Sequence, residues 1–178
     1  MNIEPTQMKA REQLYRHFLR TLRMLPAGSA LSLSHPELPQ ARLHSGVVLP
    51  VDDSAGRVDA EFFDIAYWLV AATPGAESRY FDSIVRAWER FGWPTRTDRD
   101  CRPRAAYTRT PDHVGFSVQE SVDGFVSLSG STAPFAVGSA AGPPFPELIE
   151  HPLITPEVPP KGSSGGATDP LTGRAHPR

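Results

Sequence analysis

Two amphipathic helix patterns, each followed by a group of strand patterns, most strongly limit the folds open to this chain. Apolar side chains recur at helical spacing over residues 14–25, and again from Phe81 to Phe91. Three strand patterns follow the first helix, at 30–34, 43–51 and 62–72. Four shorter ones follow the second helix, at 95–99, 104–110, 114–121 and 125–130.

This order predicts an α+β fold. Two halves, each a helix followed by a meander of strands, suggest a two-layer sandwich with an antiparallel sheet and both helices packed on one face. The expected order is α-β-β-β-α-β-β-β(-β), and turns near Pro111 and Gly124 join the last three strands into a meander.

The ends of the second helix are marked by residues with distinct backbone preferences. Thr73 is a suitable N-cap, and Pro74 suits the first helical position, where a missing N–H costs nothing. Gly92 stands where a left-handed C-terminal cap is needed, and Pro94 prevents continuation. Within this helix, Trp88 is expected to be buried against the sheet.

The register of the last hairpin follows from the burial of one face. A two-residue loop would pair Val118 with Ser129, an apolar with a polar side chain. A three-residue loop, 122–124, pairs Val118 with Leu128 instead, and burial of one face favours this register. It places Gly124 at the left-handed position of the turn, so we predict a positive φ there.

Proline and glycine are concentrated at the C-terminus. Residues 131–178 hold 10 of the 19 prolines and 6 of the 14 glycines. Such a segment buries too little apolar surface to offset its ordering entropy, about 1–2 kcal/mol per residue. We therefore predict one α+β domain over residues 5–130 and a largely disordered tail over 131–178.

Composition excludes several classes of function. The formal net charge is only −2, which argues against a dedicated nucleic-acid binder. No run approaches the roughly 18 apolar residues of a transmembrane helix. The single cysteine, Cys101, cannot form an intramolecular disulfide, and residues 1–7 lack the features of a signal peptide. These features predict a cytoplasmic protein.

The common enzyme motifs are absent from the sequence. It contains no G-x-G-x-x-G, Walker A, G-x-S-x-G or H-E-x-x-H pattern, and one cysteine excludes a C-x-x-C zinc site. The six histidines show no ligand spacing, and Cys101 is expected to be a surface residue. We therefore predict no catalytic residue, no cofactor and no metal. An enzyme whose residues converge from distant positions is the least favoured alternative.

Strand 62–72 is apolar on both faces, which suggests a binding surface. With both helices on one face, Phe62, Trp68 and Val70 would form an uncovered patch on the other. The six side chains expected at this interaction surface are Phe62, Trp68, Val70, Gln119, Phe125 and Ser127. Three covers are considered: a second copy of the chain, a ligand or partner, or the apolar part of the tail, namely Phe145, Leu148, Ile149 and Leu153.

The favoured function is a non-catalytic interaction or binding module whose partner is a protein or a small apolar ligand. The alternative is an accessory protein that docks on a membrane surface or a partner through the basic face of the first helix. That face consists of Lys9, Arg16, Arg20 and Arg23. The oligomeric state is left open.

Residues 80–132 resemble a family of uncharacterised actinobacterial small secreted proteins and lipoproteins. The resemblance rests on the helix end at 86–93, on Arg102-Pro103, on residues 117–124 and on residues 128–132. It implies a shared fold, names no activity, and makes association with the cell envelope the alternative location. Members carry a lipobox and a cysteine after the last strand; this chain has neither, and Phe135 stands near the position of that cysteine.

Overall fold

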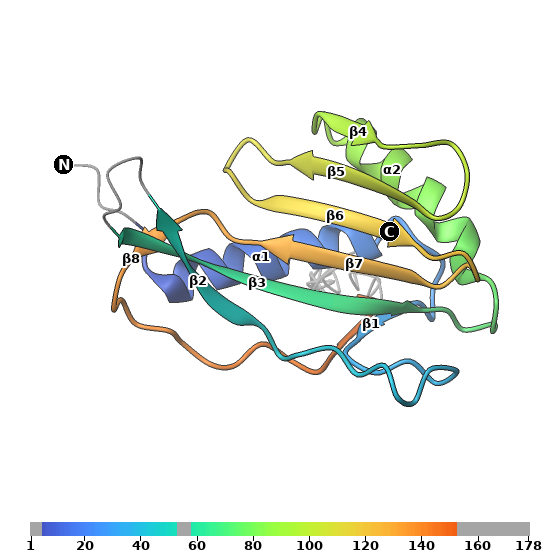
Figure 1. Ribbon diagram of the computed structural model, residues 1–178, viewed down its shortest axis with the longest axis horizontal. Coiled ribbons are helices and arrows are strands. Elements are labelled where there is room, and N and C mark those ends of the chain that lie inside the picture. Colours follow the sequence, from blue (N-terminus) through green and yellow to red (C-terminus); the bar gives the residue numbers. More distant parts are fainter. Residues whose placement is uncertain (1–4, 53–57, 153–178) are drawn as a thin grey trace, which may run out of the picture.

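The computed structural model describes residues 5–52 and 58–152 of the chain (Figure 1). Its two helices are α1 (Gln7–Leu22) and α2 (Tyr80–Arg90), and a 3-10 turn, η1 (Glu77–Arg79), precedes α2. The strands of this described part are β1 (Ala30–Ser32), β2 (Val47–Asp52), β3 (Val58–Val70), β4 (Thr95–Thr97), β5 (Arg104–Arg109), β6 (Gly115–Glu120), β7 (Val126–Ser131), β8 (Phe135–Ala136) and β9 (Leu148–Glu150).

The long strand β3 organises the sheet. The strand order is β4-β5-β6-β7-β3-β1-β9, and every pairing is antiparallel. The first half of β3 also pairs with β2 on one side and with β8 on the other. The predicted meander of the last three strands is confirmed, because β5, β6 and β7 are neighbours in sequence order.

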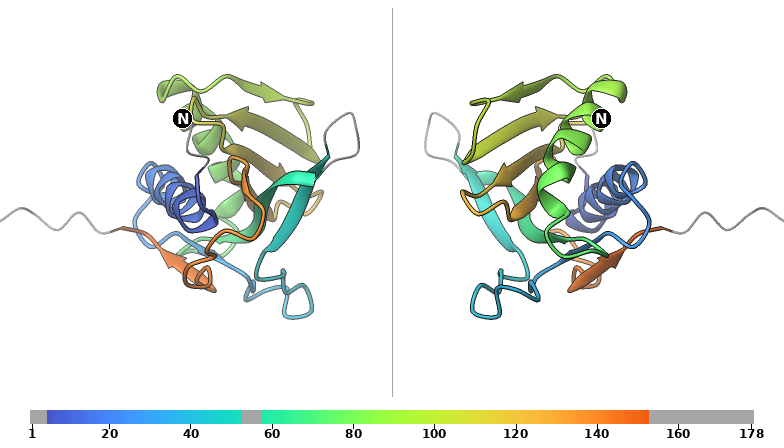
Figure 2. Two further views of the ribbon diagram at one scale, coloured as in Figure 1. Left: turned by 90° about the vertical axis from the view of Figure 1, so that its left-hand side faces the viewer. Right: turned by 90° about the vertical axis from the view of Figure 1, so that its right-hand side faces the viewer.

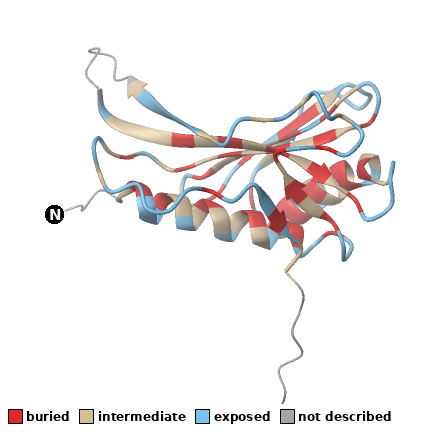
Figure 3. Ribbon diagram, turned by 90° about the horizontal axis from the view of Figure 1, so that it is seen from below, coloured by how far each residue is buried: buried red, intermediate tan, exposed pale blue. Residues whose placement is uncertain are grey.

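Both helices lie on one face of the sheet, as predicted (Figure 2). Side chains of β3 alternate: Phe63, Ile65, Tyr67 and Leu69 are at most 2% exposed, whereas the residues between them are half-buried. Apolar side chains of α1 and α2 pack onto the buried set, and Trp88 of α2 is fully buried, as expected. The core is therefore the layer between the helices and the sheet (Figure 3).

The local predictions at two glycines are confirmed. Gly124 has φ +89°, and Val118 pairs with Leu128 in the register of the three-residue loop. Gly92 has φ +75°; its N–H donates to the carbonyl of Glu89, and the N–H of Trp93 donates to that of Trp88. These two hydrogen bonds form a Schellman cap at the end of α2.

The predicted start of the second helix is wrong. Thr73 and Pro74 do not cap it, since residues 73–76 form a turn in which the N–H of Ala76 donates to Thr73. Gly75 has φ +78° within this turn, a conformation that a helix cannot contain. The backbone becomes helical only at η1, and α2 begins at Tyr80.

Two strand boundaries also differ from the prediction. The second strand begins at Val47 rather than at residue 43, because residues 33–46 form a loop beside β1. The third begins at Val58 rather than at residue 62, because its first half forms a hairpin with β2. A period-two pattern does not reveal these ends, since pairing with a neighbour decides where a strand stops.

The folded domain extends beyond residue 130. Strands β8 and β9 join the sheet, and Phe135, Phe145 and Ile149 are buried in the core. The boundary at residue 130 is therefore corrected to at least 152. The proline-rich composition of this segment reflects its loops, while a few isolated apolar side chains hold it to the domain. Residues 153–178 lie outside the described part of the chain.

Candidate functional site

The open face of the sheet, opposite the helices, carries a hollow of about 380 Å³. Three of its lining residues stand in one row across the sheet, because Gln119 of β6 pairs with Ser127 of β7, which pairs with Trp68 of β3. Phe125, directly before β7, completes an apolar wall, and Tyr107 of β5 lies at another side. Four of the six predicted surface residues therefore come together here.

The chain itself partly covers Trp68. Its indole Nε1 donates a hydrogen bond of 2.6 Å to the carbonyl oxygen of Ala41, in the loop between β1 and β2. The ring of His35, in the same loop, makes edge contacts with Trp68 and Phe125 at centroid distances of 6.1 and 5.1 Å. The expected bare patch is thus half-covered by a segment that was not among the three covers considered.

The other two predicted surface residues lie apart from the hollow. Phe62 is six residues from Trp68 along β3, a separation of about 20 Å in a strand, and it pairs with Leu49 of β2. Val70 pairs with Ala30 at the opposite end of β3. Both are half-buried and neither lines the hollow, so the predicted single patch of three apolar residues is incorrect.

None of the tail residues that the structure describes lines this hollow. Phe145 packs against Phe63 and Ile149 pairs with Leu31, so both lie on the helix-covered face. Leu148 points the other way from a strand at the sheet edge and is 50% exposed. Leu153 lies outside the described residues. The role assigned to Phe145 and Ile149 as a cover is corrected to a role in the core.

A second hollow, of about 450 Å³, lies beside the first on the same face and shares Tyr107 with it. Its floor contains the small side chains of Ser117 and Ser129, and exposed Arg96 and Arg109 lie at its sides. Sequence reasoning did not identify this hollow. The alternating serines of β7 were a usable signal, since in that register they share the open face.

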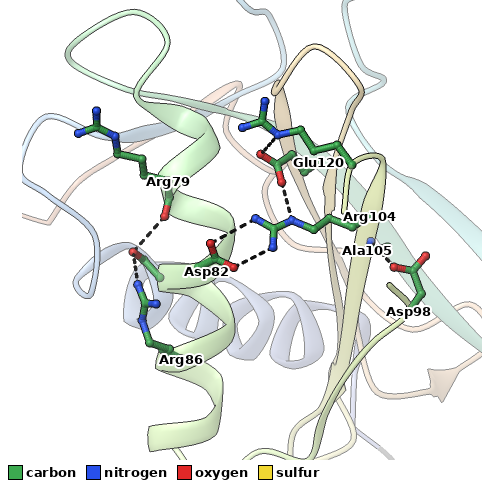
Figure 4. Close-up of polar contacts among 9 residues, drawn as sticks. Arg79, Asp82, Arg86, Asp98, Arg104, Ala105 and Glu120 are labelled. Carbon is green, nitrogen blue, oxygen red and sulfur yellow. Dashed lines mark hydrogen bonds and ion pairs between the residues drawn. The ribbon is translucent and has the colours of Figure 1, made fainter. Parts of the chain in front are cut away.

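Two of the residues that line the first hollow, Arg104 and Glu120, belong to a network of charges. Figure 4 shows its contacts. Arg104 donates from Nε to Glu120 at 2.6 Å and from both terminal nitrogens to Asp82 of α2. Arg102 donates to the other oxygen of Glu120 at 2.8 Å. Burial alone would lower the pKa of Arg104, but the hydrogen bonds with Glu120 and Asp82 outweigh it and raise that pKa above its usual value.

These carboxylates are poorly suited to proton transfer. Glu120 is wholly buried, and each of its oxygens already accepts a hydrogen bond from an arginine. Asp98 accepts a hydrogen bond of 2.7 Å from the N–H of Ala105, and this bond lowers its pKa. The lining of the hollow includes no histidine. The arrangement can bind and orient a molecule, but its described side chains do not form an acid–base pair.

One cluster has the residue types of a metal site. Ligand atoms of His35, Glu37 and Glu77 lie within 4.8 Å of one another, and His35 Nε2 is 3.8 Å from Glu77 Oε1. However, the N–H of Glu37 donates to His35 Nδ1 at 3.2 Å, which places the proton of the neutral ring on Nε2. A metal bound through Nε2 requires the opposite tautomer. The hydrogen bonding therefore disfavours a metal at this cluster.

One residue of the predicted basic face of α1 is paired with a carboxylate, and another lies over an aromatic ring. All four of its side chains are exposed: Lys9, Arg16, Arg20 and Arg23. Arg16 lies 3.6 Å from the carboxylate of Glu12, and the guanidinium of Arg20 lies over the ring of Phe91 at 4.1 Å. The geometry favours the open sheet face over the basic face of α1 as a binding surface.

Cys101 is exposed in the loop between β4 and β5, as expected.

In the described part of the chain, the longest helix has 16 residues, and none has the length and apolar composition needed to cross a bilayer. No family model matches the chain, and no curated protein or solved structure is significantly similar to it. The resemblance of residues 80–132 to the secreted family and the cytoplasmic location therefore remain predictions.

Proposed function

We propose that this protein is a non-catalytic binding module that holds its ligand or partner at the hollow around Trp68. The observation that carries the proposal is the composition of this hollow. Trp68 and Phe125 provide an apolar wall, and Gln119 and Ser127 provide a few polar groups beside it. Ligand sites commonly combine apolar walls with a few oriented polar groups, in volumes of about 300–1,000 Å³.

The state of the neighbouring charges supports binding over catalysis. The carboxylates at the hollow already accept hydrogen bonds from arginines or the backbone, so they fix the shape of the site rather than exchange protons. The partner class that fits best is a small apolar ligand or an apolar side chain of a protein. A ring would pack against Trp68, and its polar substituent would reach the Gln119 amide.

Titration of the full-length protein with indole, followed by amide NMR shifts, tests this proposal. We expect shifts centred on Gln119, Phe125 and Ser127, and loss of indole binding in Ser127→Tyr, whose ring fills the hollow. Ser129→Tyr is the matched control, because Ser129 is on the same strand and face but lines the second hollow. Shifts centred elsewhere, or equal binding by Ser127→Tyr and wild type, would contradict the proposal.

A further inference from the structure

An apolar groove lies on the helix side of the molecule, between α1 and the segment 139–146 that crosses it. We call this segment the strap. Three sets of hydrogen bonds fix it to the helix: Ser139 accepts from the N–H of Gln7, the carbonyl of Ala140 accepts from the N–H of Met8, and Arg11 donates to two strap carbonyls at 3.3 Å. Because these hydrogen bonds fix the strap to α1, the groove between them is part of the folded structure.

The walls of this groove are mostly apolar. Its volume is about 320 Å³, at the small end of the range for ligand sites. Tyr15 and Phe145 meet edge to face at a centroid distance of 5.9 Å, and Met8 is 39% exposed at the rim. The remaining apolar lining comes from the strap: Ala141, Pro143, Pro144 and Pro146.

Arg11 is the single cation in the lining, and no carboxylate among the described residues pairs with it. Its guanidinium lies 4.2 Å from the centre of the Phe63 ring, and Nη1 donates to the carbonyls of Ala141 and Pro143. Nη2 makes no hydrogen bond within the described chain, and Nε is buried without a partner. Glu12 also lines the groove, but its carboxylate faces Arg16 at 3.6 Å.

An uncompensated, half-buried cation is unfavourable, because burial removes water without supplying a countercharge. Consistent with this, burial lowers the pKa of Arg11. A ligand that brought an anion to Nη2 would remove this penalty. A carboxylate fits best, since its planar oxygens match the geometry of a guanidinium.

We propose that the groove binds a small apolar carboxylate. Its apolar body lies between Tyr15, Phe145 and the strap prolines, and its carboxylate accepts hydrogen bonds from Arg11. This site is on the opposite side of the sheet from the hollow around Trp68, so it is separate from the binding function proposed above.

Calorimetric titration of the full-length protein with three ten-carbon probes tests the proposal. The probes are decanoate, decanol and decyltrimethylammonium, which share one chain and differ in charge. We expect decanoate to bind at least about tenfold more tightly than decanol. The reason is that a hydrogen bond between two charged groups strengthens binding by more than about a factor of ten. Decyltrimethylammonium is expected to bind more weakly than decanol. Equal affinities for decanoate and decanol would overturn the proposal.

Three variants locate the site. Arg11→Gln should lose at least about tenfold in decanoate affinity while its affinity for decanol stays within about twofold, and Arg11→Lys should keep part of the preference for the anion. Ala141→Trp, which fills the groove from the strap without changing Arg11, should abolish binding of both probes. Arg23→Gln, which changes an exposed arginine at the C-terminal end of α1 outside the groove lining, is the matched control and should bind as wild type does. Unchanged decanoate binding in folded Arg11→Gln or Ala141→Trp, or loss of binding in Arg23→Gln, would overturn the assignment.

Discussion

The covered and open faces of the sheet are built by the same strands but with different side chains. On the covered face, Ile65, Tyr67 and Leu69 of β3 are fully buried. On the open face, the neighbouring residues of β3 are half-buried, and β7 presents a run of alternating serines. Successive side chains of a strand point to opposite faces of the sheet, so each strand contributes to the core on one face and to the surface on the other.

The two faces also differ in how much free space lies beside the strands. At Gly130 of β7 the helix α1 approaches so closely that an added Cβ would lie 2.6 Å from Leu14 and 2.8 Å from Phe18. At Gly115 of β6, whose nearest neighbour would be 3.9 Å away, the open face leaves space. The covered face is therefore optimised for contact within the chain, and the open face remains free to contact something else.

The largest predicted difference between the faces concerns two tryptophans. Trp88→Ala should cost about 3–5 kcal/mol of unfolding free energy, because Trp88 is fully buried and donates to Thr21 Oγ1 at 3.2 Å. Trp68→Ala should cost about 1–2 kcal/mol, because Trp68 is only half-buried beneath the loop at Ala41. Urea unfolding of both variants measures the comparison. Equal costs would show that the open face contributes to the core as much as the covered face does.

The two glycines test the same contrast by adding a methyl group. Gly130→Ala should destabilise the protein by about 1–3 kcal/mol, because the methyl overlaps the side chains of Leu14, Phe18 and Phe116. Gly115→Ala should change stability by less than about 0.5 kcal/mol. Thermal unfolding of the two variants provides the measurement. A large cost for Gly115→Ala would mean that the open face is more tightly covered than its 3.9 Å clearance indicates.

Much of the covered face could be predicted from the sequence because its signals are local. The Gly92 cap, the loop of residues 122–124 and the pairing of Val118 with Leu128 each depend on a few adjacent residues and on the burial of one face. The apolar period of α1 identified its buried side in the same way.

The open face was harder to predict because long-range contacts decide it. The loop that carries His35 and Ala41 reaches Trp68 from more than 25 residues away, and no periodic pattern announces such a contact. Phe145 and Ile149 were missed as core residues because Phe145 stands alone among prolines and Ile149 belongs to a pair of apolar residues too short to show a periodic pattern. The sequence identified four residues of the hollow but gave no indication of the groove at Arg11.

A smaller loss of stability is predicted for a substitution at the C-terminal end of α2, one of the two helices on the covered face. Gly92→Ala should cost about 1 kcal/mol, because the left-handed conformation at φ +75° disfavours any side chain although no atom would clash. Gly92→Asn is the matched control, and its smaller loss in urea unfolding would attribute the cost to backbone conformation. Equal losses for alanine and asparagine would show that another property of Gly92 is responsible.

A further effect of similar size depends on pH and concerns the contact that joins α1 to the β5–β6 turn. Asp112 accepts hydrogen bonds from Thr110 and Gln13 and lies 2.8 Å from His17 Nε2. Burial alone would raise the pKa of Asp112, but these contacts with Thr110 and His17 outweigh it and lower the pKa to about 2.

Because the pKa is lower in the folded state, the stabilisation by Asp112 is fully present above its ordinary pKa of 3.8 and is lost as the pH falls from there towards 2. We expect about 1 kcal/mol at neutral pH, since the Asp112 side chain is 35% exposed and solvent screens the interaction. Unfolding free energies of wild type and Asp112→Asn, measured from pH 6 to pH 2, should therefore differ by this amount above pH 4 and converge below it. His17→Gln should narrow the pH-dependent difference because it removes one contact that lowers the pKa. If the unfolding free energies of wild type and Asp112→Asn differed by the same amount down to pH 2, the ionised form of Asp112 would not be what stabilises the contact between α1 and the turn.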